Sequence, residues 1–557
     1  MAQALNSSTS EKSAFQLGWQ GIGIILLYGV TLLIGYHLSQ RTLTMHEVIF
    51  AQPAKEMLAS GDFLVPRVGG VVFGDKPLLT MWLMAASIEL TGSLDEWVVR
   101  LPSSLAALLT AVVIGMTAAR WFGKRVGILA GLAQLTSYYV LQMATLAESD
   151  MLLICSVTLA ICFFAWVQIP SPIGQVQGRW TPWVFGFLVG LTFMIKGPIG
   201  VVFIGLTVGS WMVLNRQWSL LRFFFHPGGL LVFLLMALPY PLLSGLRYPP
   251  ILDEWLLHNW GRFKGDLTQV ENREPLWFYF LNLPMVLLPW TPCLIIALMD
   301  RKVWKHPMVW LALCWFLPGV LFLSCSAWKW KHYMSPLLPG LTIIAAVGLE
   351  RWLYVTSQVL QRYWRPLMLG TLLLGIAGVA VIYKTNPLGE LPIAILVSVA
   401  SISAMVVMEL NYRKLHRWSV PALFTMIWMM IAGVFIWVLP VHDHCRVQVE
   451  FADRINQRQE LDKPLHLVNL SYHQIIYYLK KPIVRLDKIK QFQSLAEHID
   501  DDKYVLIKQK DISEIQSLGM VQPLDSCPNT RRKTGPGDNL VLVRLQTVLP
   551  AQFNVNP

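Results

Sequence analysis

Charged residues are scarce in this chain of 557 residues. Aspartate, glutamate, lysine and arginine together make up 14% of it, whereas soluble globular domains contain ~25%. Hydrophobic residues account for 55%, and the mean hydropathy is +0.50. A soluble enzyme of this size is therefore disfavoured, and one large polytopic membrane domain is expected. The 23 tryptophans and 33 prolines argue against a simple coiled coil or a disordered chain.

Cysteine is also rare, with seven residues in the chain. Most of them lie in or beside apolar stretches, where a buried thiol is the ordinary state: Cys155, Cys162, Cys293, Cys314 and Cys325. Cys445 and Cys527 both lie in the polar C-terminal region. A disulfide between them is compatible with an extracytoplasmic location, but the sequence does not give their separation and leaves the pairing open.

The net charge of the chain is +12. The basic residues lie between apolar stretches rather than on one basic face. This distribution favours cytoplasmic loops that contact anionic lipid headgroups. Nucleic acid is therefore not expected as a partner.

Long apolar stretches dominate the first 440 residues. A helix that crosses a bilayer needs ~20 apolar residues, with a range of ~17–25. About thirteen stretches come close to this length, at 19–38, 98–118, 126–144, 150–169, 181–196, 199–214, 229–245, 277–297, 307–325, 334–349, 366–383, 391–409 and 419–439. Pro77–Leu90 is apolar but short, and we expect an interfacial or re-entrant helix there. The first apolar run is long enough to remain as a span, so no cleavable signal peptide is expected.

Short basic loops give the orientation of these spans. With this count of spans, all of the basic clusters fall on one side: those around Arg120–Arg125, Arg216–Arg222, Arg301–Lys305, Arg351–Arg365 and Arg413–Arg417. Basic loops stay in the cytoplasm, so the N-terminus is predicted to be cytoplasmic. The large loop 39–96 and the tail from 442 are then extracytoplasmic.

The sequence therefore predicts an all-α membrane domain over residues 1–441 and a small α/β domain over residues 442–557. Strands are expected at 465–470, 503–507 and 539–545, and helices at 472–480 and 491–499. The tail shows no metal cluster, nucleotide loop or nucleophile motif. It is interpreted as an accessory domain packed on the membrane part.

Polar residues gather in the loops of the predicted outer face, while the span interiors are nearly free of charge. Acidic and imidazole groups in these loops can take up a proton or bind a cation. Lysine and arginine can hold a phosphate. Since the spans offer no polar path across the bilayer, chemistry at one membrane face is favoured over translocation. A donor with a long lipid tail would explain why such a site adjoins apolar helices.

The same loops resemble those of a known family. TMHEVIFAQPAKEML (44–58), GDKPLL (74–79), EWVVRLPS (96–103), AESDMLL (147–153), KGP (196–198), HNWGRF (258–263) and KWKHYMSPLLP (329–339) follow one another in the order found there. They resemble the C-type, polyprenyl-phosphate-dependent glycosyltransferases, especially the bacterial lipid A aminoarabinose transferases and, more distantly, the protein O-mannosyltransferases. The ordered set is more specific than any single motif.

This resemblance implies an activity and a location. A sugar would move with inversion from undecaprenyl phosphate to an acceptor, such as lipid A, another envelope component or a protein, at the periplasmic face. The chain would be a multi-pass protein of the bacterial inner membrane. A thirteen-span architecture with an outer C-terminal domain is also usual in the family.

The resemblance assigns catalytic roles to His46, Glu47 and Asp150. Asp150 matches the family's second acidic position. The family usually has Asp-Glu in the first loop, where this chain has His46-Glu47. Histidine can also act as a base, with an unperturbed pKa of ~6.5, and Glu47 keeps the neighbouring acidic place. An acceptor that is already an ionised phosphate would need no strong base.

Further residues match binding positions of the family. Lys76, Arg262, Lys329 and Tyr333 match residues that contact the donor phosphate. Asp75 and His258 match positions associated with a divalent metal in the aminoarabinose branch, so a divalent metal is a possible cofactor; two ligands do not make a metal site by themselves.

Two other classes remain open at the level of sequence. A transporter or lipid flippase without covalent transfer would also have many spans and a charged outer vestibule. A catalytically silent scaffold is the third class, suggested by His46 in place of the usual aspartate.

Overall fold

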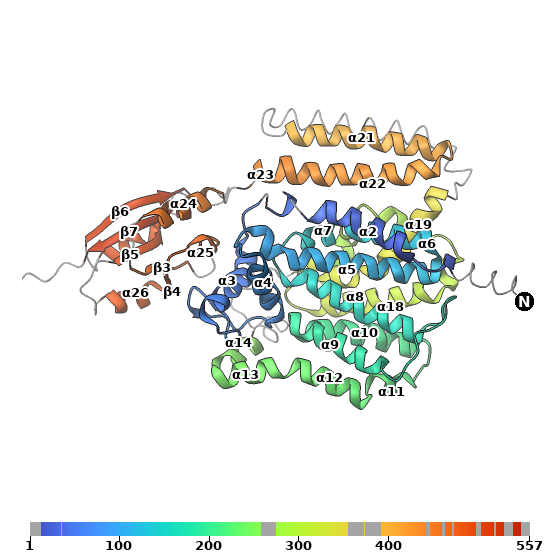
Figure 1. Ribbon diagram of the computed structural model, residues 1–557, viewed down its shortest axis with the longest axis horizontal. Helices are drawn as coiled ribbons and strands as arrows, with labels where there is room; N and C mark the ends of the chain where they lie inside the picture. The colour runs from blue at the N-terminus through green and yellow to red at the C-terminus, as the bar shows by residue number, and fades with distance from the viewer. Residues whose placement is uncertain are drawn as a thin grey trace, which may run out of the picture. The chain divides into compact units, whose positions relative to one another are not determined.

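The structure is a computed structural model, and it describes residues 13–34, 36–39, 41–257, 274–354, 373, 391–441, 443, 446–458, 463–470, 473–496, 503–516, 520–528 and 538–546. The chain forms two compact units (Figure 1). The first, named the helical unit, comprises Met1–Gln40, Gly74–Leu83 and Arg100–Leu439. The second, named the mixed unit, comprises Arg41–Phe73, Met84–Val99 and Pro440–Pro557.

Long apolar helices that run side by side, together with shorter helices between them, build the helical unit (Figure 1). In chain order they are α2 (Gly18–Leu33), α5 (Glu96–Phe122, whose first residues belong to the mixed unit), α6 (Lys124–Thr136), α7 (Tyr138–Ala144), α8 (Ser149–Gln168), α9 (Thr181–Lys196), α10 (Pro198–Leu214), α11 (Leu220–Phe224), α12 (Pro227–Ala237), α13 (Pro239–Arg247), α14 (Pro250–Leu256), α16 (Phe278–Val286), α17 (Thr291–Leu298), α18 (Pro307–Cys325), α19 (Pro339–Tyr354), α21 (Leu391–Tyr412) and α22 (His416–Gly433).

These helices match the predicted spans. Among the described residues, six helices are long and apolar enough to cross a membrane, or up to nine if each bent pair is one span. Each predicted span overlaps a helix except 366–383, which lies almost wholly outside the described residues. The apolar stretch at 77–90 forms α4 (Leu79–Thr91), which at 13 residues is too short to cross a bilayer. The prediction of a polytopic helical membrane protein is confirmed.

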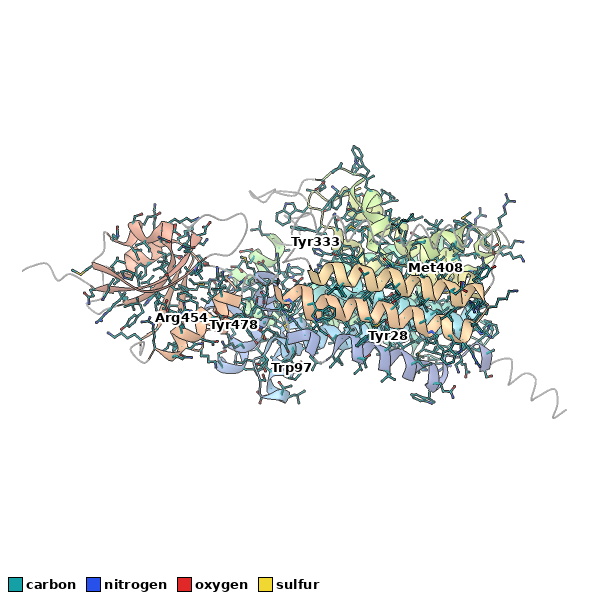
Figure 2. The ribbon with its side chains drawn as sticks, turned by 90° about the horizontal axis from the view of Figure 1, so that it is seen from above. Tyr28, Trp97, Tyr333, Met408, Arg454 and Tyr478 are labelled. Atoms are coloured by element: carbon teal, nitrogen blue, oxygen red, sulfur yellow. The ribbon has the colours of Figure 1, made fainter. Side chains whose placement is uncertain are left out.

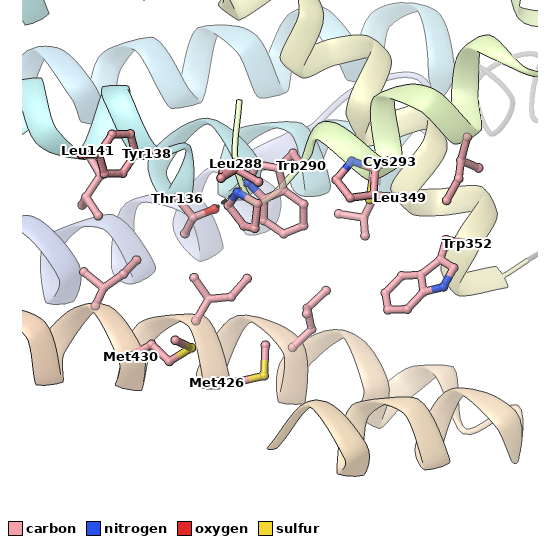
Figure 3. Close-up of a pocket in the computed structure, with 16 residues that line it drawn as sticks. Thr136, Tyr138, Leu141, Leu288, Trp290, Cys293, Leu349, Trp352, Met426 and Met430 are labelled. Atoms are coloured by element: carbon pink, nitrogen blue, oxygen red, sulfur yellow. Dashed lines mark hydrogen bonds between the residues drawn. The ribbon is translucent and has the colours of Figure 1, made fainter. Parts of the chain in front are cut away.

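Two of the bent helix pairs are joined by hydrogen bonds at their breaks. The axis turns by 63° between α6 and α7 and by 103° between α16 and α17. The Tyr138 N–H at the first break donates to the Leu288 carbonyl at the second, over 2.9 Å. The Trp290 indole donates to Thr136 Oγ1 over 3.1 Å (Figure 3). Since lipid offers no hydrogen bonds, each break depends on such a partner.

Polar contacts join α2 to α22 and join α5 to the segment that follows α2. The helices α21 and α22 lie side by side (Figures 1 and 2). The Tyr28 hydroxyl of α2 donates to the Phe424 carbonyl of α22 over 3.0 Å, and the two rings meet edge to face. The fully buried Arg100 of α5 donates to the Leu38 carbonyl. Apolar packing therefore supplies most of the contact between these helices, and single polar bonds tie them together.

A five-stranded sheet lies at the centre of the mixed unit. Its strands are β3 (Leu465–Val468), β4 (Ile483–Leu486), β5 (Lys503–Lys508), β6 (Met520–Cys527) and β7 (Leu540–Gln546). Their order is β4-β3-β5-β7-β6. The pairs of β3 are parallel and those of β7 are antiparallel. The predicted strands overlap β3, β5 and β7, whereas β4 and β6 were not predicted.

The mixed unit also contains helices and part of the first loop. The tail contributes α24 (Arg446–Gln457), α25 (Ile475–Tyr478), α26 (Ile489–Ala496) and α27 (Ile512–Ile515). The loop contributes α3 (Met45–Ser60) and the short hairpin β1–β2 (Arg67–Val68 and Val71–Val72). The predicted helices at 472–480 and 491–499 overlap α25 and α26. The predicted domain boundary between 441 and 442 stays a prediction.

The disulfide left open by the sequence is not formed at Cys527. Its thiol is free and buried, and it lies 3.6 Å from the Val447 carbonyl oxygen. Cys445 lies outside the described residues.

Close helix packing in the helical unit predicts a strong position effect for glycine substitutions. A Cβ on Gly348 of α19 would overlap the Cys293 carbonyl oxygen of α17, while a Cβ on Gly209 of α10 meets nothing within 4 Å. We expect Gly348→Ala to lower the stability by about 1–3 kcal/mol through overpacking. Gly209→Ala serves as the control and is expected to be neutral or slightly stabilising. Thermal unfolding in detergent checks both; equal melting temperatures would contradict the packing.

Candidate active site

A cavity of about 150 Å³ in the helical unit collects three of the charged residues that the sequence singled out, namely Asp75, Lys76 and Asp150. It lies where α8 begins, α9 ends, the loop before α4 passes and the chain turns after α18. Its polar lining consists of Asp75, Lys76, Asp150, Lys196, Ser326, Trp328 and Tyr333. Apolar side chains such as Leu153, Phe203 and Phe322 complete the wall. The cavity therefore places charged groups beside an apolar surface.

An ion pair between two helix ends is the central contact of this cavity. Lys196 Nζ lies 2.7 Å from Asp150 Oδ1, and the side chains are only 19% and 8% exposed. Asp150 is in the first turn of α8, and Lys196 is the last residue of α9. Each charge is thus favourable to its own helix dipole. Lys76 and His332 also act electrostatically on Asp150.

Local sequence explains why Lys196 ends its helix. Gly197 follows with φ of +72°, a left-handed conformation that costs glycine little. Pro198 then starts α10, since proline suits the first position of a helix. The Lys-Gly-Pro run thus reverses the chain and leaves the lysine at the cavity.

Two contacts hold the loop that carries Asp75 and Lys76. The Gly74 N–H donates to Glu254 Oε2 of α14 over 3.0 Å, and the Tyr240 hydroxyl of α13 donates to the Lys76 carbonyl over 3.2 Å. A Cβ at residue 74 would lie 2.7 Å from both Glu254 Oε2 and Ile251 Cγ1. A larger residue at position 74 would therefore force the Glu254 and Ile251 side chains to shift.

Aromatic rings form another side of the cavity. Lys196 Nζ lies 5.8 Å from the centre of the Tyr333 ring (labelled in Figure 2), within the range of a cation–π contact. The His332 and Tyr333 rings meet edge to face, with centres 4.9 Å apart. Such rings, together with Trp328, give a surface on which the apolar face of a ring-shaped substrate can rest.

Lys329 has a different environment from the other predicted phosphate ligands. Its Nζ donates to the carbonyl oxygens of Ser326 and Glu274, over 2.7 and 2.9 Å, and the residue is 6% exposed. It does not line the cavity. In this arrangement the ammonium group of Lys329 stabilises the turn that carries Trp328 and Tyr333. Its predicted role at the donor phosphate stays a prediction.

His46 and Glu47 begin α3 in the mixed unit. Thr44 and Glu47 form a capping box: the Glu47 N–H donates to Thr44 Oγ1, and Glu47 Oε2 accepts from the Thr44 N–H. Arg41 approaches the same carboxylate at 3.5 Å, and Glu47 is fully buried. His46 is exposed. Of the two adjacent candidates, the glutamate is thus committed to the helix end and the histidine is accessible.

Of the two predicted metal ligands, Asp75 and His258, the structure describes only Asp75. Asp75 lines the cavity, whereas His258 lies outside the described residues, as does Arg262. The part of the chain that the structure describes contains no group of three or more histidine, cysteine, aspartate or glutamate side chains able to hold a metal. One carboxylate does not make a metal site, so the cofactor stays a prediction.

Lys196 lines the cavity, although in the sequence it was noted only within the KGP motif and was given no role. Its signal was present in the sequence, because a lysine at the end of an apolar span is costly without a partner. The partner, Asp150, lies 46 positions earlier, and no local pattern links the two. The structure brings together Asp75, Lys76, Asp150 and Tyr333 as predicted neighbours, although their chemical roles stay predictions.

A second, larger cavity of about 560 Å³ has a different character (Figure 3). It lies between α22 and the breaks of the bent helices, and its walls include Trp290, Leu349, Trp352, Met426 and Met430. No aspartate, glutamate, lysine, arginine or histidine lines it. Of these two cavities, only the smaller one carries side chains suited to acid–base or phosphate chemistry.

Known proteins resemble this chain in sequence. The model of the family described as dolichyl-phosphate-mannose-protein mannosyltransferase matches residues 75–241. The undecaprenyl phosphate-alpha-4-amino-4-deoxy-L-arabinose arabinosyl transferase of Edwardsiella ictaluri is 30% identical over 377 residues, which are 66% of this chain and 64% of that protein. The protein of the same name from Pseudomonas aeruginosa is 27% identical over 401 residues, covering 69% and 70%. The chain thus spans slightly less than two thirds of the Edwardsiella ictaluri relative.

Solved structures resemble the fold. The crystal structure of ArnT from Cupriavidus metallidurans bound to undecaprenyl phosphate has a TM-score of 0.75 and 22% identity, covering 95% of this chain and 98% of that one. The apo oligosaccharyltransferase of Archaeoglobus fulgidus has a TM-score of 0.51 and 10% identity, covering 88% and 69%. The resemblance to polyprenyl-phosphate-dependent glycosyltransferases that the sequence predicted is confirmed.

The buried ion pair predicts strong coupling between Asp150 and Lys196. Removing one partner of such a pair costs about 3–5 kcal/mol, because the other charge stays buried and uncompensated. We expect Asp150→Asn and Lys196→Met to lower the melting temperature in detergent, and the double variant to recover most of the loss. A double variant whose loss equals the sum of the single losses would show that the two side chains do not interact.

Proposed function

We propose that this chain is an integral membrane glycosyltransferase that moves a sugar from a polyprenyl phosphate to an acceptor at the outer face of the bacterial inner membrane. The observation that carries the proposal is the cavity where Lys76, Asp150 and Lys196 meet beside apolar helices. The names of the similar proteins suggest undecaprenyl phosphate as the lipid and 4-amino-4-deoxy-L-arabinose as the sugar. Lipid A is the acceptor to test first.

We propose that the transfer is a direct displacement, as the resemblance to the family implies. The phosphate of the donor would lie against Lys76, with Arg262 as a further ligand, and the tail would follow the apolar wall into the bilayer. An acceptor oxygen attacks the anomeric carbon from the side opposite the phosphate, so the configuration inverts. The bond from that carbon to the phosphate oxygen breaks, and the polyprenyl phosphate leaves with the electron pair. Preorganised cations stabilise this leaving charge.

The acceptor decides whether a base is needed. An ionised phosphate oxygen attacks without losing a proton. A hydroxyl would have to give its proton to Asp150 or to His46, since the Glu47 carboxylate is used by the helix cap. Lys196 keeps Asp150 ionised by direct pairing. No step in this scheme uses a metal; a divalent ion at Asp75 and His258 is a separate proposal, checked by metal analysis of the purified chain.

We further propose about thirteen spans, a cytoplasmic N-terminus and an extracytoplasmic C-terminal α/β domain. The basic loops support this orientation, as positive loops stay inside. To test the orientation, cysteine is introduced in place of Lys124 or Lys510 and is labelled from each side of sealed vesicles.

A transporter or lipid flippase is less consistent with these observations. The charged side chains of the cavity stand at helix ends, and the larger cavity among the spans carries no ionisable side chain of the acidic or basic types. The similar curated proteins are named as transferases. Flux of the lipid-linked sugar across vesicles without covalent transfer would favour this alternative.

The proposed role of Lys76 gives a direct test. The full chain in lipid nanodiscs is supplied with undecaprenyl phosphate-4-amino-4-deoxy-L-arabinose and lipid A, and modified lipid A is measured by mass spectrometry. We expect Lys76→Gln to lower turnover by about 10²-fold or more, because a lost stabiliser of developing charge has this effect.

Lys331→Gln is the matched control, since Lys331 is exposed and belongs to the same set of outer-face lysines. It is expected to keep activity within about twofold, as a solvated surface charge contributes little. Full turnover in Lys76→Gln, with both proteins folded, would refute the role of Lys76. No transfer by the unsubstituted chain with this donor would refute the proposed substrate pair.

A further inference from the structure

The first predicted outer loop and the C-terminal tail are joined by partly buried polar contacts within the mixed unit. The segments are separated by almost the whole membrane domain, with 435 positions between Leu43 and Tyr478. The contacts gather at α25, a short helix with two tyrosines in its last turn. This arrangement raises the question of what the tail does for the loop that carries His46 and Glu47.

One hydroxyl group ties together two parts of the loop. The Tyr478 oxygen accepts a hydrogen bond from the Leu43 N–H over 2.8 Å, and the same hydroxyl donates to Glu96 Oε1 over 3.0 Å. Leu43 is fully buried and directly precedes Thr44, the N-cap of α3. Glu96 is the first residue of α5. Tyr478 thus sets the start of α3 against the start of α5.

Neighbouring contacts fix Tyr478 itself. The Tyr477 hydroxyl donates to the Leu94 carbonyl over 2.8 Å. Lys55 of α3 donates to the carbonyls of Tyr477 and Leu479, both over 2.8 Å. The Asn456 side chain of α24 donates to the Tyr478 carbonyl over 2.9 Å. The backbone of α25 is therefore held from two sides, and its tyrosine rings have little freedom.

A second contact from the tail reaches the same end of α3. Asp443 accepts from the Thr42 N–H over 2.9 Å and from the Thr42 hydroxyl over 2.8 Å. Thr42 is 2% exposed. Two consecutive residues before the helix cap are thus bonded to tail side chains, and hydrogen bonds shielded from water hold geometry more firmly than exposed ones.

We propose that Tyr478 is a positioning residue for the transfer reaction, through which the C-terminal tail holds the first turn of α3, with His46 and Glu47, in its working place. The inference deepens the proposed function and rests on it. Tyr478 does not contact substrate in this scheme. It acts through the Leu43 N–H and the cap at Thr44, so its loss moves the helix end rather than removing a reacting group.

The test uses the full chain in nanodiscs and Tyr478→Phe, which removes only the hydroxyl. We expect amide hydrogen exchange in the peptide around Leu43–Glu47 to become about tenfold faster, because the Leu43 N–H loses its acceptor. The turnover number should fall about tenfold, since a small misplacement of a catalytic group is costly. The KM for the donor should change less than about twofold, as the cavity with Lys76 and Lys196 lies in the helical unit.

Matched variants separate this role from a loss of folding. Tyr504→Phe alters a different tyrosine of the same unit, which is buried on β5, and should leave exchange at Leu43 and turnover unchanged. Glu96→Gln keeps an oxygen that accepts from Tyr478 and should retain most activity, whereas Glu96→Ala should behave like Tyr478→Phe. The double variant of Tyr478→Phe and Glu96→Ala should lose little more than either one alone.

The outcomes distinguish the inference from the proposed function. Native exchange and native turnover in Tyr478→Phe would overturn the inference while the transfer activity stands. Faster exchange with native turnover would also overturn it, because the contact would then be structural only. An unsubstituted chain that transfers no sugar would overturn the proposed function, and that result appears in the wild-type assay before any variant is made.

Discussion

The pairing of Asp150 with Lys196 is the interaction on which the helical unit's chemistry depends. Neither charge would be stable at the edge of apolar helices without the other, and Lys196 Nζ lies 2.7 Å from Asp150 Oδ1. The Gly-Pro reversal after Lys196 and the loop held by Glu254 then bring Lys76 to the same place. A charged cavity beside apolar helices is thus produced by pairing opposite charges.

Much of the fold could be predicted from the sequence, because its physical signals are local. Apolar runs of bilayer length identify helices directly, and alternation in short β-branched runs identified β3, β5 and β7. The pattern Thr44-x-x-Glu47 is a capping-box signature and could have shown in advance that Glu47 serves the helix end. The partner of Lys196, the bends at α6–α7 and α16–α17, and the sheet order could not be predicted, since each depends on residues far apart in the chain.

The contacts of the mixed unit also could not be predicted from the sequence. The tail has the strands and helices of an ordinary small domain, and its sequence contains no catalytic motif. Its chemistry-related part is α25, a helix of four residues that is unremarkable in sequence. Contacts from Tyr477, Tyr478 and Asp443 to the loop show that the tail holds the backbone that carries His46 and Glu47.

The mutual hydrogen bonds between the breaks of α6–α7 and α16–α17 have a consequence for biogenesis. Residues 124–144 leave the ribosome well before residues 278–298. The Tyr138 N–H therefore lacks its acceptor, the Leu288 carbonyl, while more than a hundred further residues are synthesised. During that interval an unsatisfied amide in hydrocarbon is costly. We therefore expect residues 124–144 to stay beside the insertion machinery, or to form a straight helix, until residues 278–298 are inserted. The bend between α6 and α7 would form only when the two segments come into contact.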